Sequence, residues 1–408
     1  MRVLISGAGI AGPTLAYWLL HYGFEPTLVE SAPQLKTGGY VIDFWGAGFD
    51  IADRMGLMPE IRRQGYMVRQ VSIVNRHGKR IAGFATDSVA RITRGRFVSI
   101  PRGDLAAILF AAIEGRVETL FGDTVDRIEQ TGSAVEATLR HGGRRAFDLV
   151  VGADGLHSRI RQLVFGEESR YEKYLGYKAA AFEVAGYAPR DELVYLMYTQ
   201  VGQQVGRFAL RGDRTMFLFT FRDEEYEIPP SLAEQKARLR DRFGASGWEC
   251  PQILLALDQC RDLYFDRVSQ IRMGSGPGSN HDPSRQLWSK GRVTLIGDAA
   301  SCVSLLAGQG TALAMIAAYI LAGELHRARG DHDLAFARYE QLFAPFVLMK
   351  QNAALRLAGF FAPQSRFSML LRNQVINLMA VPWISNFAIG RDLADRIAIP
   401  EYESPSAG

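Results

Sequence analysis

The chain has 408 residues, of which 48% are hydrophobic and 22% charged, with a formal net charge of +4; this is typical of a soluble protein of about two domains. Its basic residues are scattered rather than clustered, which favours no nucleic-acid partner, and its three cysteines form neither a metal-ligand pattern nor a disulfide framework. We therefore expect no metal site, a reducing, cytoplasmic location and no signal peptide, and no apolar run in the sequence is long enough to span a membrane.

The first thirty residues have the pattern of a β-α-β unit. An apolar strand over 2–6 leads into a glycine-rich turn, a helical pattern follows, and a second strand covers 26–30. The turn has the spacing G-x-G-x-x-G, formed by Gly7, Gly9 and Gly12. In such a turn the first glycine permits a tight bend, the second lets the backbone approach a pyrophosphate, and the third lets helix and strand pack closely.

Two further features of this unit indicate a bound dinucleotide. Ile10 and Ala11 open the helix, where free N–H groups and the helix dipole favour an anion. Glu30 ends the second strand, where a carboxylate can accept from both ribose hydroxyls of an adenosine and would repel a 2′-phosphate. The alternative, a glycine-rich turn without a ligand, is disfavoured because strand, helix and acid are all in place.

The next segments alternate between loops, helices and short strands. Residues 38–48 are rich in glycine and predict a loop, whereas 50–64 predict a helix. Alternating apolar residues around a turn at 75–78 predict a hairpin within 68–84, and a helix is expected to begin at 100–105. Short strands are expected over 117–120, 134–139 and the end of 144–152.

The second half of the chain begins with β-rich runs over 171–272, which predict an antiparallel sheet in a second domain. A helix is expected within it over 232–243, and 274–283 has the composition of a linker. The remaining expected elements are a buried strand over 292–296, a helix over about 309–327, and a mostly helical tail over 335–397 with breaks near Pro363 and Pro382.

Two more glycine-acid elements follow buried strands. Asp154 lies in GADGLHSRIR, and Asp298 lies in GDAASCVSLLAGQG. A carboxylate so close to a core is costly unless a donor pairs with it. Either aspartate alone is equally compatible with a helix cap, but both together, in a chain that begins with a dinucleotide turn, favour a ligand.

These three elements together resemble the class A FAD-dependent monooxygenases, the aromatic hydroxylases built on the para-hydroxybenzoate hydroxylase fold. The resemblance covers nearly the whole chain and rests on GAGIAG with Glu30, on GADGLHSRIR and on GDAASCVSLLAGQG. The stretches 38–48 and 305–325 are most similar to the tetracycline-degrading branch. The chain departs from the commoner family pattern at Ser301, where a histidine is frequent, and at Leu305, where a proline is frequent.

The resemblance implies an α/β fold in which a Rossmann-type FAD-binding domain is interleaved with an antiparallel β-sheet substrate domain and followed by C-terminal helices. The expected boundaries are 1–70, 100–170 and 284–330 for the FAD-binding domain, 71–99 and 171–283 for the substrate domain, and 331–408 for a helical brace. The apolar part of that brace is also compatible with a membrane surface, but polar residues interrupt it and favour packing across both domains.

The resemblance also implies the cofactors and the residues that bind them. FAD is the expected cofactor, and NAD(P)H is a transient co-substrate without a domain of its own. Backbone N–H groups of Gly308, Gln309 and Gly310 are expected to face the pyrimidine edge of the flavin and to stabilise negative charge there. No side chain is assigned as a general base. The expected cofactor-binding residues are Gly7, Gly9, Ile10, Ala11, Gly12, Glu30, Asp43, Arg102, Val125, Asp154, Arg161, Asp298, Gly308 and Gly310.

Two residues, Arg102 and His157, have an alternative interpretation. Arg102 is expected near the ribityl and phosphate part of FAD, and its alternative role is that of a surface arginine at a helix start. His157 lies beside Asp154, but we interpret it as structural rather than catalytic.

The activity implied by the resemblance is hydroxylation of an aromatic or polycyclic small molecule, such as a tetracycline, with O₂ as co-substrate and a flavin C4a-hydroperoxide as the oxygen donor. The substrate pocket is expected between the β-rich domain and the flavin. Its candidate residues are Phe182, Glu183, Gln203, Phe217 and Phe219, although alternating phenylalanines are equally compatible with a core. We expect a monomer or homodimer.

Three other functions are compatible with parts of the pattern. A flavin-dependent reductase or dehydrogenase would share the fold without oxygen transfer. A non-catalytic flavin-containing protein would bind aromatic compounds without consuming NAD(P)H. A halogenase is disfavoured because the sequence has no W-x-W-x-I-P element.

Overall fold

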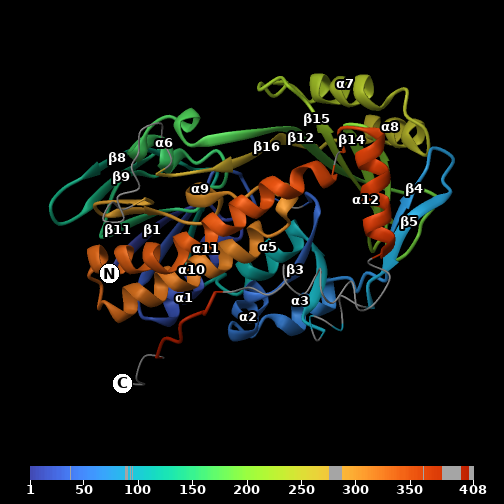
Figure 1. The fold of residues 1–408 in the computed structure, drawn as a ribbon. Helices are drawn as coiled ribbons and strands as arrows, with labels where there is room; N and C mark the ends of the chain where they lie inside the picture. The colour runs from blue at the N-terminus through green and yellow to red at the C-terminus, as the bar shows by residue number, and fades with distance from the viewer. Residues whose placement is uncertain are drawn as a thin grey trace.

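The computed structural model describes residues 1–36, 38–87, 91, 93, 95–274, 287–361, 363–378 and 397–403, and for 356–361 only the backbone. The expected linker after Gly274 and the expected break near Pro382 lie outside these residues. Figure 1 shows a sheet with long helices on it in one half of the molecule and a second, larger sheet in the other half.

A six-stranded sheet forms the centre of the first half, in the order β17-β18-β11-β1-β2-β7. Its strands are β1 (Arg2–Ser6), β2 (Glu25–Glu30), β7 (Glu118–Phe121), β11 (Leu149–Gly152), β17 (Ser289–Lys290) and β18 (Val293–Leu295). Strand β1 runs parallel to β2 and β11, and β11 runs parallel to β18. The three glycine-acid elements follow β1, β11 and β18, so all of them start at the same edge of the sheet, where ligands bind in open α/β folds.

Three helices lie together beside this sheet. They are α1 (Ala11–His21), α10 (Gly310–Arg327) and α11 (His332–Phe361), and α10 packs on both of the others (Figure 1). Helix α10 is buried from Leu313 to Leu325, and its small side chains allow close packing. Helix α2 (Ala47–Arg54) also packs on α10, and a Cβ atom on Gly48 would lie only 2.6 Å from the Ala312 Cα.

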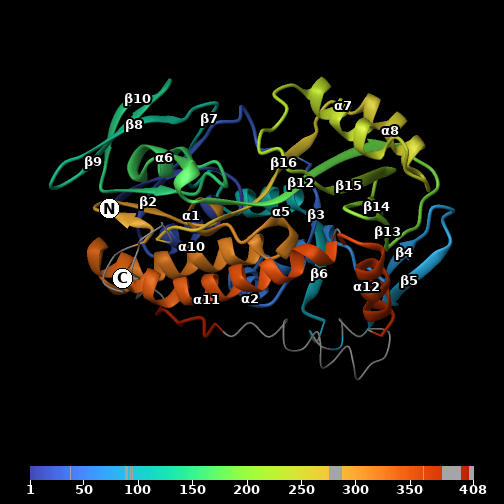
Figure 2. The same cartoon turned by 45° about the horizontal axis from the view of Figure 1, so that its top comes forward.

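A seven-stranded sheet forms the second half, in the order β16-β12-β15-β14-β13-β4-β5. Its strands are β4 (Gln70–Val74), β5 (Arg80–Ala85), β12 (Glu172–Ala185), β13 (Val194–Gln200), β14 (Gln203–Ala209), β15 (Arg214–Arg222) and β16 (Tyr264–Ile271). The predicted hairpin is therefore β4–β5, and it joins the sheet through parallel pairing of β4 with β13. Helices α7 (Leu232–Phe243) and α8 (Cys250–Gln259) cover one face, as Figure 2 shows.

A two-stranded ribbon replaces the loop expected over 38–48. Strand β3 (Val41–Trp45) pairs antiparallel with β6 (Phe97–Pro101). The expectation of a loop was wrong because the glycines flank the strand, whereas VIDFW alternates: Ile42 and Phe44 are buried in the core, and Asp43 lies on the opposite face of the strand. The helix expected over 50–64 is likewise two helices, α2 and α3 (Met58–Gln64), because Gly56 between them adopts a left-handed φ of 72°.

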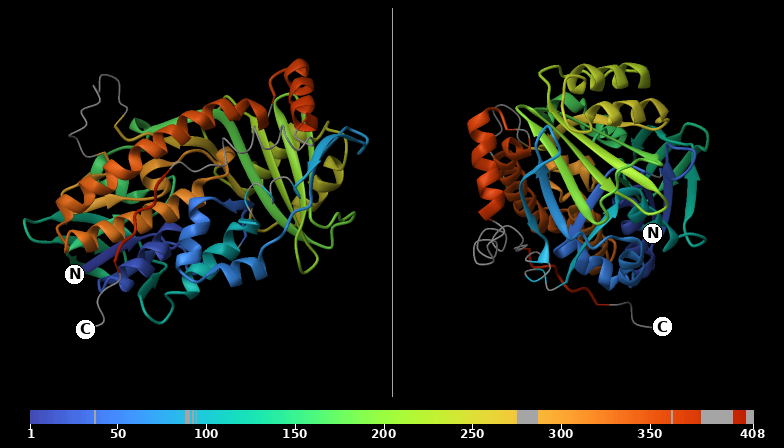
Figure 3. Two further views of the ribbon diagram at one scale, coloured as in Figure 1. Left: turned by 60° about the horizontal axis from the view of Figure 1, so that its bottom comes forward. Right: turned by 90° about the vertical axis from the view of Figure 1, so that its right-hand side faces the viewer.

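The remaining elements complete the two halves. A three-stranded sheet comprises β8 (Val125–Gln130), β9 (Val135–Leu139) and β10 (Gly143–Phe147). The shorter helices are α5 (Arg102–Ala111), α6 (Arg159–Phe165) and α9 (Asp298–Ser301), with 3-10 turns at Glu168–Arg170 and Leu305–Ala307. Helix α11 ends just before Pro363, and α12 (Arg366–Leu378) packs on β5, so the C-terminal helices contact both halves (Figure 3). The domain boundaries given above stay a prediction.

Two features are absent from the described residues. No helix there is long and apolar enough to cross a membrane. No group of three or more His, Cys, Asp or Glu side chains in the same residues is arranged to hold a metal ion.

Candidate functional site

The three glycines of the first turn have different surroundings. Gly7 has a φ of 107°, and a Cβ atom on it would lie 2.5 Å from the Ala153 carbonyl oxygen. A Cβ atom on Gly12 would lie 1.9 Å from the Gly7 carbonyl oxygen. A Cβ atom on Gly9 would meet only an ordinary contact, 3.5 Å from Nη2 of Arg102. Gly7 and Gly12 are therefore required by backbone packing, whereas Gly9 leaves space in front of the turn.

Two helix starts meet at this turn. Helix α1 begins after Ile10 and α10 begins after Gln309, and among the described residues no side chain caps either start. Their first N–H groups are thus available to an anion, and both helix dipoles favour one. The third glycine-acid element touches the first, because a Cβ atom on Gly297 would lie 3.2 Å from the Ala11 Cβ. This arrangement suits a ligand with a pyrophosphate and a second electron-rich group.

Glu30, the last residue of β2, lies beside the turn. Its Oε2 accepts from the backbone N–H of Ala8 and its Oε1 from that of Ala32, each at 2.8 Å. The segment that leads to Val125 lies beside it, since the Asp123 N–H donates to the Glu30 carbonyl oxygen at 3.1 Å. The Ser31 hydroxyl also donates to Oε1, at 3.2 Å. A carboxylate has about four acceptor sites, so Glu30 can hold the turn and still accept from a ribose hydroxyl.

Asp298 lies beside the start of α10. It begins α9, and in the part of the chain that the structure describes no side chain caps that helix, so the capping alternative does not hold for Asp298. A Cβ atom on Gly310 would lie 3.6 Å from its Oδ1. Burial raises the pKa of Asp298, while the nearby Arg102 and a hydrogen bond with Cys302 act in the opposite direction. Arg102 thus faces this site and the Gly9 turn rather than the outer surface.

Asp154, in contrast, is a local cap. Its Oδ1 accepts from the Ser158 hydroxyl at 2.5 Å and its Oδ2 from the Ile160 N–H at 3.0 Å, at the start of α6. Arg161 is fully buried and donates to the carbonyl oxygens of Ala299 and Leu156 and to Oε2 of Glu168. This geometry does not support a direct contact between Arg161 and a cofactor, because its guanidinium ties α6 to α9 instead.

His157 has the structural role expected for it. Its Nδ1 lies 2.8 Å from Oε1 of Glu168 and its Nε2 lies 3.1 Å from Oδ1 of Asp266. These hydrogen bonds raise the pKa of His157 to about 10. The imidazolium therefore links the α6 region to β16 of the larger sheet.

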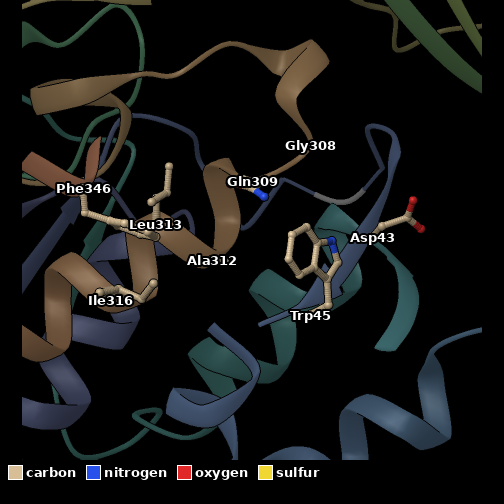
Figure 4. Close-up of a pocket in the computed structure, with 8 residues that line it drawn as sticks. All are labelled: Asp43, Trp45, Gly308, Gln309, Ala312, Leu313, Ile316 and Phe346. Atoms are coloured by element: carbon tan, nitrogen blue, oxygen red, sulfur yellow. The ribbon is translucent and has the colours of Figure 1, made fainter. Parts of the chain in front are cut away.

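A pocket that is partly open to solvent adjoins the start of α10 (Figure 4). Its lining residues are Asp43, Trp45, Gly308, Gln309, Ala312, Leu313, Ile316 and Phe346. It brings together three residues expected at the flavin, namely Asp43, Gly308 and Gln309. Trp45 and Phe346 add aromatic walls that the sequence did not indicate, because β3 and α11 are far apart in the chain.

The expected substrate residues divide between the two faces of the seven-stranded sheet. Phe182, Phe217 and Phe219 are fully buried in the core beneath α7 and α8, and Gln203 donates to Ser246 on that same side. The structure therefore contradicts a pocket role for these four residues. Glu183 lies on the opposite face, where it pairs with Arg214 at 2.8 Å and burial raises its pKa.

The face that carries Glu183 has pocket candidates that the sequence did not single out. Tyr195, Phe208, Met216 and Leu218 form one cluster there with Tyr66. The sequence shows that these residues alternate with the core phenylalanines. It does not show which of the two faces α7 and α8 cover.

Comparison with known proteins identifies the family. A profile of the family described as FAD binding domain matches residues 1–256. A flavin-dependent monooxygenase from an unknown prokaryotic organism is 34% identical over 413 residues, which cover 99% of each chain. The chain belongs to the FAD-dependent monooxygenases. The crystal structure of the tetracycline destructase Tet(51) matches this monooxygenase with a TM-score of 0.83 and 31% identity, over 98% of this chain and 99% of the other.

A further relative has a name that states no activity. An uncharacterized protein of Mycobacterium tuberculosis is 38% identical to this monooxygenase over 357 residues, which cover 86% of this chain and 91% of the relative. The site is consistent with the family assignment, since a bound dinucleotide needs space at the glycine turn, free N–H groups at a helix start and an acid near the ribose, as found at Gly9, at the start of α1 and at Glu30.

Proposed function

We propose that this monooxygenase hydroxylates an aromatic or polycyclic small molecule, with NADH or NADPH as electron donor and O₂ as oxygen source. FAD, when bound, supplies the hydride acceptance and oxygen activation. The single observation that carries the proposal is that Asp298, Arg102 and the uncapped start of α10 converge beside an apolar pocket. The oxygen-transfer route expected from the sequence stays a prediction.

Each cofactor-binding residue has a proposed task. The N–H groups that follow Gly9 hold the pyrophosphate, Glu30 accepts from the adenosine ribose, and the backbone near Val125 borders the adenine. Asp298 and Arg102 hold the ribityl chain and the adjacent phosphate. The N–H groups of Gln309 and Gly310 stabilise negative charge on the pyrimidine ring, because preorganised donors at a helix start favour an anion. The Gly308 N–H, also expected there, instead donates to the Leu305 carbonyl oxygen at 3.1 Å. Asp154 acts indirectly, by fixing α6.

The substrate is proposed to lie between the flavin and the sheet face that carries Glu183. Aromatic and apolar side chains on that face, including Tyr195, Met216 and Leu218, exclude water, which protects a reactive oxygen donor from decay. Tet(51) and Tet(55) are tetracycline destructases, so a tetracycline is one candidate. Smaller aromatic compounds are equally compatible with a wall that is mostly apolar.

The test uses purified yellow holoenzyme with NADH or NADPH and a panel of phenols, quinolones and tetracyclines. Oxidation of the nicotinamide, O₂ uptake and product mass are followed in the same reactions. A compound that accelerates oxidation and gains one oxygen atom supports the proposal and names the substrate class. Oxidation that no compound accelerates, with no product gaining oxygen, would identify a reductase. Binding of a compound without any NAD(P)H oxidation would identify a non-catalytic binder.

A further inference from the structure

A polar cluster connects the β3–β6 ribbon with the larger sheet. Asp43 and Ser99 are cross-strand partners in the ribbon, and the Ser99 hydroxyl donates to Oδ1 of Asp43 at 2.6 Å. Tyr195 of β13 interacts with the same hydroxyl, and the charge of Asp43 acts on its phenol. Burial raises the pKa values of both Asp43 and Tyr195. Three polar side chains from three strands thus form one network at the junction of the two halves.

This network lies between the pocket at the start of α10 and the sheet face that carries Glu183. Asp43 also lines the pocket that Gly308 and Gln309 share. Tyr195 packs on Phe208, with ring centroids 4.5 Å apart, in the apolar cluster on the face that carries Glu183. Ser99 itself is fully buried, so it reaches a ligand only through its two neighbours. A ligand polar atom between these surfaces would meet a carboxyl group and a phenol within an otherwise apolar wall.

We infer that Tyr195 and Asp43 form the polar recognition element of the substrate site, that Ser99 is their positioning residue, and that the element selects substrates with a hydroxyl or amino donor over aromatic carboxylates. The inference rests on the proposed function, because it assigns specificity within the same site. The Asp43 carboxyl group that accepts from Ser99 has a second oxygen for a substrate donor. The Ser99 hydrogen goes to Asp43, so the Tyr195 phenol donates to the Ser99 oxygen and keeps a lone pair that can accept from the same substrate group. A methyl ether would leave an acceptor unpaired, which is how such sites reject analogues.

The charge of Asp43 also disfavours aromatic carboxylates. A substrate carboxylate beside Asp43 would place two acids in one poorly solvated space, which is unfavourable unless one of them takes up a proton. Arg214, on the face that carries Glu183, does not offset this, since it pairs with Glu183. On the pocket side the Lys350 ammonium lies over the rings of Trp45 and Phe346, 5.9 and 5.2 Å from their centroids. Arg372 lies beside a different part of β13. It donates to Gln204, which also accepts from Thr199, and Thr199 is four residues beyond Tyr195 on that strand.

The experiment measures equilibrium binding of three matched probes to FAD-loaded enzyme: 2-naphthol, 2-methoxynaphthalene and 2-naphthoate. Binding is followed by the flavin absorbance change, so the readout does not depend on turnover. We expect 2-naphthol to bind about tenfold more tightly than either analogue, the discrimination that one buried hydrogen bond provides. Tyr195→Phe and Ser99→Ala are expected to reduce this preference to less than about threefold.

Two controls separate recognition from folding. Tyr198→Phe removes a hydroxyl from the same strand on its opposite face, where Tyr198 contacts Gly247, and should leave the preference unchanged. Ser99→Thr retains a hydroxyl and should restore the preference relative to Ser99→Ala. Equal binding of the three probes, tighter binding of 2-naphthoate, or no binding of any probe would overturn the inference. An oxygenated product from an enzyme without this preference would overturn it while leaving the proposed function intact.

Discussion

A Cβ atom on Gly12 would lie 1.9 Å from the carbonyl oxygen of Gly7, so the two glycines hold the start of α1 against the end of β1. Gly9, in the same motif, has no such restriction from the fold, because its nearest contact would be with the Arg102 side chain at 3.5 Å. The motif therefore combines two glycines required by backbone packing with one whose open side faces the ligand.

Alanine substitutions should separate these roles. Gly12→Ala should lower the free energy of unfolding by about 2–3 kcal/mol or abolish folding, since the added methyl group overlaps backbone atoms. Gly9→Ala should change the stability of the apoprotein by less than about 1 kcal/mol but should reduce FAD affinity at least tenfold, because the methyl group occupies space next to the phosphates. Urea denaturation of both apoproteins and FAD titration measure the two effects. Unchanged FAD affinity in Gly9→Ala would contradict this division.

The dinucleotide turn could be predicted from sequence because its determinants are local. Gly7, Gly12 and Glu30 lie within one β-α-β unit, and their spacing carries the geometry. The strand β3 could not be predicted in this way, because it forms only by pairing with β6, more than fifty residues away. The burial of Arg161 likewise depends on Ala299, which is distant in sequence.

Asp298 and Arg102 should control FAD retention. Asp298→Ala and Arg102→Ala should each weaken FAD binding at least tenfold, because charge-assisted hydrogen bonds to a buried ligand are lost. The bound FAD per chain after gel filtration, read from absorbance, measures the effect. Arg140→Ala is the control, since Arg140 forms an exposed pair with Asp126 and should retain full occupancy. Full occupancy in Asp298→Ala would remove Asp298 from the site.

His157 should make stability depend on pH in the alkaline range. Its pKa is raised from about 6.5 to about 10 by Asp266 and Glu168. The stabilisation is thus fully present below about pH 6.5 and is lost as the pH rises toward 10. His157→Gln should lower the free energy of unfolding by less than about 1 kcal/mol at pH 6, since the side chain is 46% exposed and solvent screens the pair. The effect should shrink as the pH rises toward and through 10.

The control for this prediction is His77→Gln, since His77 lies in the exposed turn between β4 and β5. It should leave the pH profile of the unfolding free energy unchanged. A His157→Gln variant whose effect is constant from pH 6 to 10 would show that the histidine acts through packing rather than charge.

Leu218 and Phe219 are neighbours on β15 that lie on opposite faces of the sheet. Phe219→Ala should lower the free energy of unfolding by about 3–5 kcal/mol, because it opens a cavity in the core beneath α7 and α8. Leu218→Ala should cost less and should instead change the KM for whichever panel compound is hydroxylated. Urea denaturation and steady-state kinetics at a temperature where both variants are folded measure these effects. The opposite pattern would place the pocket on the α7–α8 side.

The sequence predicted that side chains on β15 alternate between two faces, but it did not predict which of these faces is the core. Phe217 and Phe219 differ from Met216 and Leu218 only in which face they occupy, and that face is decided by where α7 and α8 pack. Aromatic side chains suit a core as well as a pocket, so composition alone does not distinguish the two.

The central claim is that this protein transfers an oxygen atom from O₂ to an organic substrate at the site formed by Asp298, Arg102 and the start of α10. The most direct measurement is the mass of the product formed by FAD-loaded enzyme and NADPH under isotopically labelled O₂, with the panel compound that most accelerates oxidation. We predict a product that carries one labelled oxygen atom, absent in the Asp298→Ala variant. A product without label, or complete recovery of the consumed O₂ as hydrogen peroxide, would contradict the account.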